Sequence, residues 1–124
     1  MNIQSALTEG LNILKNKSIL SAKLDSEILM AKALGKKREY IILNDDKIIK
    51  EQNLKYFKKL VHERATGKPI AYLLKKKSFW NSEFYVNKNT LIPRPDTEII
   101  LEQVLKFTKK KNYLNILDIG VGSG

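Results

Sequence analysis

The sequence of 124 residues contains no cysteine, one histidine and only three arginines. Without cysteine, the chain cannot build a disulfide framework, a thiolate metal site or a thiol nucleophile. It also lacks the run of about 20 apolar residues that spans a bilayer, and its N-terminus lacks the charged and apolar regions of a secretory signal. We therefore expect a cytoplasmic protein with no membrane segment and no metal site.

The formal net charge of +10 comes almost entirely from lysine. A basic protein can bind a polyanion such as RNA, but arginine, which makes the better forked contacts with phosphate, is scarce. Lysine, isoleucine and asparagine share A/T-rich codons, so a biased genome would produce the same excess. We favour this compositional origin of the charge over a nucleic-acid footprint.

Residues 1–74 show the apolar spacing that is typical of helices. Ser21 can cap the second helix and Gly35 can end it. The expected apolar faces are Ile3, Leu7, Leu11 and Leu14 within residues 1–20, Leu24, Ile28 and Ala31 in the second helix, and Leu54, Phe57, Leu60 and Val61 in a helix over residues 51–66. Gly67 then ends this last helix and Pro69 prevents its resumption. The pattern predicts a small all-helical unit.

The pattern changes in the second half of the chain. Aromatic and β-branched residues on both sides of the turn-like Asn81-Ser82 predict a β-hairpin within residues 75–95. Two prolines exclude a central strand at the end of this segment, and Asp96 or Thr97 is expected to cap the helix that follows. The expected buried face of this helix consists of Ile100, Leu101, Val104 and Leu105.

The chain ends in an apolar run and an acid, Asp118, followed by glycine at every second position: Gly120, Gly122 and Gly124. The apolar run predicts a buried strand at residues 116–119, and the glycines predict the turn that leaves it. Glycine lets a ligand approach the backbone closely and tolerates positive φ. The pattern fits the S-adenosylmethionine site of Rossmann-like methyltransferases, although a tight strand exit without a ligand gives the same pattern.

The most specific signal is Leu-Ile-Pro-Arg-Pro-Asp-Thr-Glu at residues 91–98. Together with Gly-Lys-Pro-Ile-Ala-Tyr-Leu at residues 67–73 and with Phe79-Trp80, it resembles the HemK family, the glutamine-amide N-methyltransferases of peptide chain release factors. The resemblance covers most of the chain. A sister group that modifies a ribosomal protein typically has serine in place of Pro95, so the sequence is more similar to the release-factor group.

The resemblance implies an α+β fold in three parts. These are a helical N-terminal domain that docks the protein substrate (1–74), a β-hairpin and Pro-Arg-Pro linker (75–95), and the first helix and strand of a Rossmann-like methyltransferase domain (96–124). The implied function is transfer of a methyl group from S-adenosylmethionine to the glutamine amide in the Gly-Gly-Gln tip of a release factor. A cytoplasmic monomer that meets nucleic acid only indirectly, through the ribosome, would fit this role. The implied cofactor-binding residues are Asp118, Gly120, Val121, Gly122, Ser123 and Gly124.

Two departures from the family pattern matter. Lys75 stands where family members usually carry a glycine, and a positive φ there would strain a lysine by about 1 kcal/mol. The Asn-Pro-Pro-Tyr motif, which in the family holds the substrate amide, is absent. We therefore expect the front part of a methyltransferase, with no catalytic residue of its own and no activity alone. The alternative is a non-catalytic basic helical module that binds a release factor or RNA.

Arg94 is the most interesting side chain outside the glycine turn, because two prolines hold its backbone. It could lie close to the substrate, or it could form an ion pair with Asp96 or Glu98 that shapes the loop. The sequence leaves both interpretations open.

The remaining polar and aromatic candidates are weaker. His62 has no recognisable partner and is expected to be solvated or partly packed. Asp45-Asp46 is expected to form a turn or cap rather than a metal site, and Trp80 to pack in the hairpin rather than to stack on a ligand.

Overall fold

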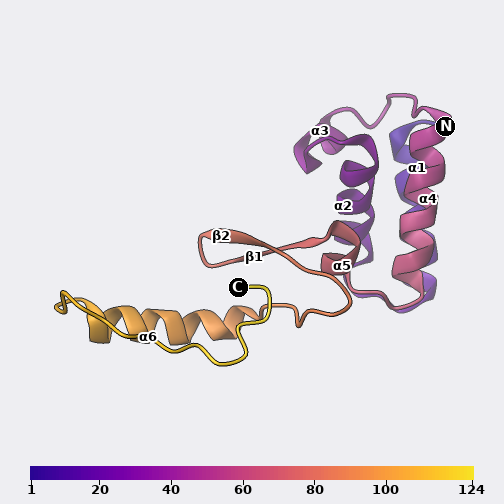
Figure 1. The fold of residues 1–124 in the computed structure, drawn as a ribbon. Helices are drawn as coiled ribbons and strands as arrows, with labels where there is room; N and C mark the ends of the chain where they lie inside the picture. The colour runs from indigo at the N-terminus through magenta and orange to yellow at the C-terminus, as the bar shows by residue number, and fades with distance from the viewer. The chain divides into compact units, whose positions relative to one another are not determined.

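The structure, a computed structural model, describes residues 1–124 and has an α+β composition with a two-stranded antiparallel hairpin. It divides into two compact units, Met1–Leu74 and Lys75–Gly124. The elements are α1 (Ile3–Asn16), α2 (Ala22–Leu34), α3 (Arg38–Leu43), α4 (Glu51–Ala65), α5 (Ile70–Leu74), β1 (Lys76–Phe79), β2 (Ser82–Tyr85), the 3-10 helix η1 (Pro95–Thr97) and α6 (Glu98–Thr108) (Figure 1). None of the helices has the length and apolar character needed to cross a bilayer.

The first unit is a bundle in which α1, α2 and α4 pack against one another (Figure 1). The predicted faces of α1 and α4 are confirmed, because Ile3, Leu14, Phe57, Leu60 and Val61 are buried and Leu7, Leu11 and Leu54 are partly buried. The predicted helix ends are also confirmed: Gly35 caps α2 with a φ of +62° and Gly67 follows α4 with a φ of +97°. A short helix that the sequence analysis did not predict, α5, begins directly after Pro69, whose carbonyl accepts the Tyr72 N–H. Proline fits this place because the first turn of a helix needs no N–H.

The buried face of α2 differs from the prediction only in part, because Ala31 is buried and Ile28 is half-buried as predicted. Leu24 is exposed, whereas Asp25, Ser26 and Glu27 are buried. Two arginines from α3 and α4 reach these carboxylates, so charged residues can take the inner face. Ser21 occupies the cap position, but its hydroxyl donates to the Asp25 carboxylate (3.0 Å) and accepts no backbone N–H.

The three main helices approach one another closely at Gly10. A Cβ at this position would lie 2.8 Å from Cζ of Phe57 and 2.9 Å from Oγ of Ser26. The Ser26 hydroxyl donates to the Leu7 carbonyl (3.2 Å), and the Phe57 ring is buried. Neither group can move away freely, so glycine is needed here although it is a poor helix former.

In the second unit, the hairpin turn lies one residue earlier than predicted. Phe79 pairs with Ser82, which makes Trp80-Asn81 the turn in place of Asn81-Ser82. This register brings the Phe79 and Phe84 rings into edge-to-face contact, with centroids 6.2 Å apart. Such cross-strand aromatic contacts stabilise hairpins. Trp80 accordingly lies in the turn, with a φ of +55°.

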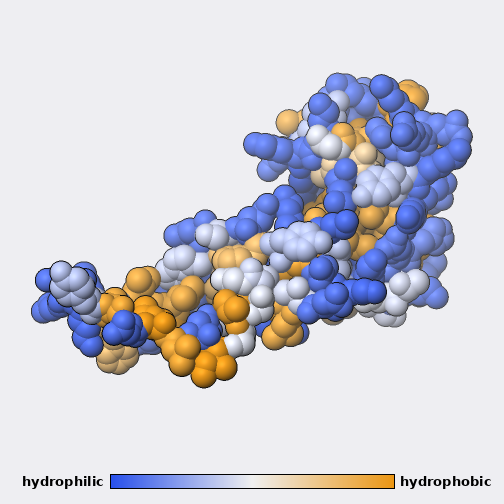
Figure 2. Space-filling view, in the orientation of Figure 1, coloured by the Kyte–Doolittle hydropathy of each residue, from blue (hydrophilic) through white to orange (hydrophobic).

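The start of α6 also differs from the prediction. Neither Asp96 nor Thr97 caps the helix with its side chain, because the first turn is a 3-10 helix that begins at Pro95. The predicted buried face is wrong as well: α6 buries no residue, and Ile100 and Leu105 are 62% and 55% exposed. Apolar side chains therefore reach the surface along α6 (Figure 2).

The strand predicted at residues 116–119 is not formed. A strand exists only where its backbone groups bond to a neighbouring strand, and the one sheet consists of β1 and β2. The expected start of a Rossmann-like domain is thus not confirmed, and the division of the second unit at residue 95 stays a prediction.

We predict that Gly10→Ala destabilises the first unit by about 1 kcal/mol. Overpacking of a well-packed core costs about 1–3 kcal/mol, which exceeds the gain of about 1 kcal/mol in helix propensity. Urea denaturation followed by circular dichroism measures the difference. The control is Asn12→Ala, an exposed position of α1, which should gain stability; a stabilised Gly10→Ala variant would refute the close approach.

We predict that Lys75→Gly stabilises the hairpin. Lys75 has a φ of +60°, in the left-handed region, where a residue with a Cβ costs roughly 1–2 kcal/mol. Its carbonyl accepts the Val86 N–H (3.3 Å), so hydrogen exchange of the Val86 amide should become slower. Lys76→Gly, in the regular strand β1, should make the same exchange faster. Equal effects of the two substitutions would contradict the strain at residue 75.

Candidate functional site

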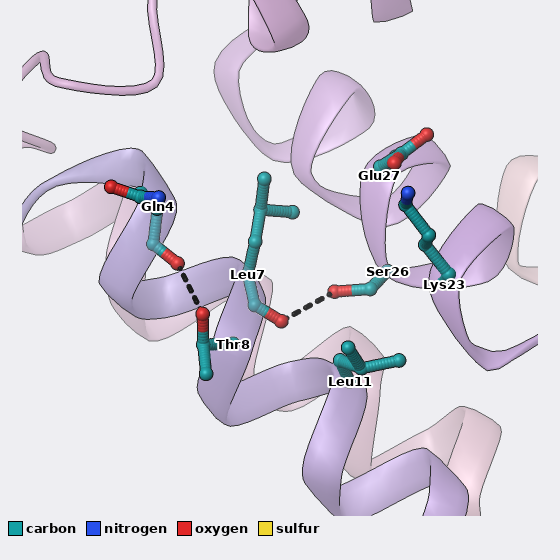
Figure 3. Close-up of a pocket in the computed structure, with 7 residues that line it drawn as sticks. All are labelled: Gln4, Leu7, Thr8, Leu11, Lys23, Ser26 and Glu27. Carbon is teal, nitrogen blue, oxygen red and sulfur yellow. Dashed lines mark hydrogen bonds between the residues drawn. The ribbon is translucent and has the colours of Figure 1, made fainter.

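A groove runs between α1 and α2 of the first unit (Figure 3). Its volume is about 170 Å³, and its lining consists of Gln4, Leu7, Thr8 and Leu11 from α1 and Lys23, Ser26 and Glu27 from α2. The α1 residues share one face because they are spaced three or four apart. Cofactor pockets usually measure about 300–1,000 Å³, so this groove suits one apolar side chain rather than a cofactor.

Most polar groups of the groove already have partners inside the unit. The Thr8 hydroxyl donates to the Gln4 carbonyl (2.9 Å), and the Ser26 hydroxyl donates to the Leu7 carbonyl (Figure 3). The Glu27 carboxylate accepts from Nε of Arg38 (2.7 Å). Lys23 takes part in none of the ion pairs of the chain. The groove therefore offers a partner an apolar floor and one free cation.

Both arginines of the first unit are held by buried carboxylates. Nε of Arg64 lies 2.7 Å from the Asp25 carboxylate, whose side chain is 4% exposed, and a second nitrogen of Arg64 donates to the Lys68 carbonyl. Arg38 binds Glu27, whose side chain is 10% exposed. Because a buried carboxylate without a partner is costly, both guanidinium groups are engaged by these carboxylates, although the Arg38 side chain stays 47% exposed. Apart from Arg38, the exposed cationic side chains of this unit are lysines.

The surface lysines are unevenly matched by acids. No acidic residue occurs at residues 10–24, which contain Lys15, Lys17 and Lys23. On α4, by contrast, Glu63 accepts a hydrogen bond from Lys68 (2.7 Å), and this contact lowers the pKa of the Glu63 carboxyl. The corner between α1 and α2, next to the groove, is thus a basic surface.

The predicted cofactor residues form an exposed turn in the second unit. Gly120, Gly122 and Gly124 all have positive φ, at +76°, +61° and +99°. No atom lies within 4 Å of a Cβ built on Gly120 or Gly122, so the backbone conformation, and not packing, accounts for these glycines. The Asp118 side chain is exposed beside this turn.

Arg94 is exposed and forms no ion pair with Asp96 or Glu98. Glu98 instead accepts the backbone N–H of Trp80 (2.7 Å), which ties the hairpin turn to the start of α6. The guanidinium of Arg94 is therefore available to a partner.

Two of the weaker candidates lie as predicted, whereas Trp80 lies in the hairpin turn and is 40% exposed. His62 is exposed on α4, and Asp45-Asp46 lies in a turn with both side chains exposed. No group of three or more histidine or carboxylate side chains could hold a metal ion.

Sequence reasoning missed the groove and the buried carboxylates Asp25 and Glu27. Two acids inside an apolar helical pattern are a usable signal for buried ion pairs. Their partners lie 39 and 11 residues away, in α4 and α3, and no local pattern connects them.

Comparison with known proteins gives consistent matches. A family model described as the PrmC N-terminal domain matches residues 5–74. A release factor glutamine methyltransferase of Clostridium botulinum is 41% identical over 124 residues, which cover 100% of the chain and 44% of that protein. One from Leptospira interrogans is 40% identical over 99% of the chain and 43% of that protein. A bifunctional methyltransferase of Rickettsia bellii is 34% identical over 99% of the chain and 27% of that protein. The chain spans less than half the length of these relatives.

We predict that Arg64→Ala destabilises the first unit by about 3 kcal/mol or more, because it leaves the buried Asp25 carboxylate without its partner. Urea denaturation again provides the measurement. Replacing both partners, Asp25→Leu with Arg64→Met, should recover much of the loss. The matched arginine control is Arg94→Ala, which should change stability by less than about 0.5 kcal/mol. A small effect of Arg64→Ala would show that the ion pair does not hold α2 and α4 together.

Proposed function

The chain belongs to the PrmC N-terminal domain family, and we propose that it forms the N-terminal part of a methyltransferase that modifies a release-factor glutamine. The observation that carries this proposal is the 41% identity to a release factor glutamine methyltransferase over all 124 residues, far beyond the helical unit alone. The aligned region therefore includes the glycine turn and the Pro-Arg-Pro loop, the most specific of the segments that carry the resemblance to the HemK family.

The proposed methyl donor is S-adenosylmethionine, and the glycine turn is the part of this chain that would help to hold it. Gly120 and Gly122, both with positive φ, leave open space where side chains would stand, so a ligand can approach the backbone of the turn from Gly120 through Val121, Gly122 and Ser123 to Gly124. The Asp118 carboxylate beside them can accept hydrogen bonds from the ligand. When bound, the cofactor would supply the methyl group, and these residues would orient it.

The proposed acceptor is the side-chain amide of the glutamine in a Gly-Gly-Gln tip. The exposed Arg94, which forms no internal ion pair, would lie near this substrate, and the helical first unit would dock the release factor. Orientation of two reactants in this way accounts for much of the rate that enzymes of this kind achieve. The proposed setting is a cytoplasmic monomer that meets nucleic acid only through the ribosome.

Residues 1–124 alone are proposed to be inactive. The sequence contains no Asn-Pro-Pro-Tyr motif, and the segment before the glycine turn does not form a strand. The turn therefore lacks the sheet that would hold it in position.

We predict that a chimera restores activity. The chimera joins residues 1–124 to the remaining C-terminal part of the Clostridium botulinum relative. It should transfer a radiolabelled methyl group to a release factor, and mass spectrometry should place the group on the Gly-Gly-Gln glutamine. Residues 1–124 alone should transfer none and should show no micromolar affinity for S-adenosylmethionine in calorimetry.

The controls separate folding from function. In the chimera, Gly122→Val should abolish cofactor binding because valine disfavours the positive φ of this position, whereas Val121→Ala should preserve it. A folded chimera that binds the cofactor but leaves every release factor unmodified would contradict the proposed substrate.

A further inference from the structure

We propose that the groove between α1 and α2 docks an acidic protein segment through one apolar side chain, with Lys23 and Lys15 binding its carboxylates. Under the proposed function, on which this inference rests, the segment belongs to the release factor, outside its Gly-Gly-Gln tip. The shape, the polarity and the charge of the groove support this assignment.

The shape and floor of the groove fit an apolar side chain. About 170 Å³ is open between Leu7 and Leu11 on α1 and the first turns of α2. Both leucines pack against the core yet remain partly exposed, so the groove presents apolar surface to solvent. Ser26 and Thr8 hydroxyls are already bonded to backbone carbonyls. An apolar group that enters the groove therefore leaves none of these hydroxyls without a partner.

The charge around the groove fits an acidic partner. Lys23 lines the groove, and Lys15 lies one helical turn beyond Leu11 on the same face of α1. No carboxylate competes for them along residues 10–24, and the nearby Glu27 is bound to Arg38. Such unpaired cations at the rim of an interface steer an acidic partner and raise its association rate.

RNA fits the groove less well than a protein. Both arginines of the first unit are bound to buried carboxylates, and neither lines the groove, so the groove offers no forked contact to phosphate. The floor between the lysines is apolar rather than aromatic or polar, so it offers no surface on which bases stack. These two features favour an acidic protein segment.

Two substitutions test the groove without touching the core. Thr8→Trp fills it from the exposed side, and Lys23→Glu reverses the charge of its rim; both positions are exposed. The matched controls are Gln52→Trp and Lys59→Glu, exposed on α4, which lines no part of the groove. Circular dichroism melts verify that all four variants fold.

The measurement is the affinity of the purified 124-residue chain for a purified release factor by biolayer interferometry at two salt concentrations. Thr8→Trp should weaken binding by at least about tenfold, as loss of a central anchor does. Lys23→Glu should mainly slow association and reduce the salt dependence. The α4 controls should bind within about twofold of the unsubstituted chain.

The outcomes separate this inference from the proposed function. Undiminished binding by Thr8→Trp and Lys23→Glu would overturn the groove alone and leave the release factor as partner. No binding by the unsubstituted chain would overturn both. Two further results would also reject the assignment. The first is binding of an unrelated RNA by the chain that Thr8→Trp abolishes, and the second is self-association of the chain in sedimentation that Thr8→Trp abolishes. Each result would show that the groove has a different occupant.

Discussion

The close contact at Gly10 sets the arrangement of the first unit. Where α1 carries no side chain, the Phe57 ring of α4 and the Ser26 hydroxyl of α2 both come within 3 Å of the place a Cβ would take. One residue thus fixes the distance of α1 from two helices at once. The groove between α1 and α2 depends on this contact, because Ser26 lines it and bonds to Leu7 on its other wall.

The buried ion pairs engage both arginines of this unit, so its unpaired surface cations are lysines. Asp25 and Glu27 face inward on α2 and each binds one arginine. Arginine suits these places because its planar group is weakly hydrated and binds carboxylates with directed hydrogen bonds. The lysines on the surface carry flexible, strongly hydrated ammonium groups. Such groups raise the association rate of a charged partner more than they form a contact of fixed geometry. The basic corner at residues 10–24 is the clearest instance.

Local signals in the sequence predicted most of the first unit. Apolar spacing located α1 and α4, and Gly35 and Gly67 marked helix ends because glycine takes positive φ without strain. The burial of Asp25 and Glu27 on α2 could not be predicted, since it depends on arginines distant in the sequence. The hairpin turn lies one residue from its predicted place for a similar reason, the contact of Phe79 with Phe84.

The prediction of a strand at residues 116–119 was wrong because a strand forms only beside a neighbouring strand. A sequence pattern contains no information on whether that neighbour is present. The groove was missed because partly exposed leucines look the same as core leucines in a sequence.

The central claim is that the helical unit docks a release factor on its α1–α2 side. Chemical-shift mapping tests it directly: the ¹⁵N-labelled chain is titrated with unlabelled release factor and amide signals are followed. The account predicts that the signals of Gln4, Thr8, Leu11 and Lys23 shift or broaden while those of the exposed positions of α4 stay unchanged. Perturbations confined to α4, or to the second unit, would contradict it.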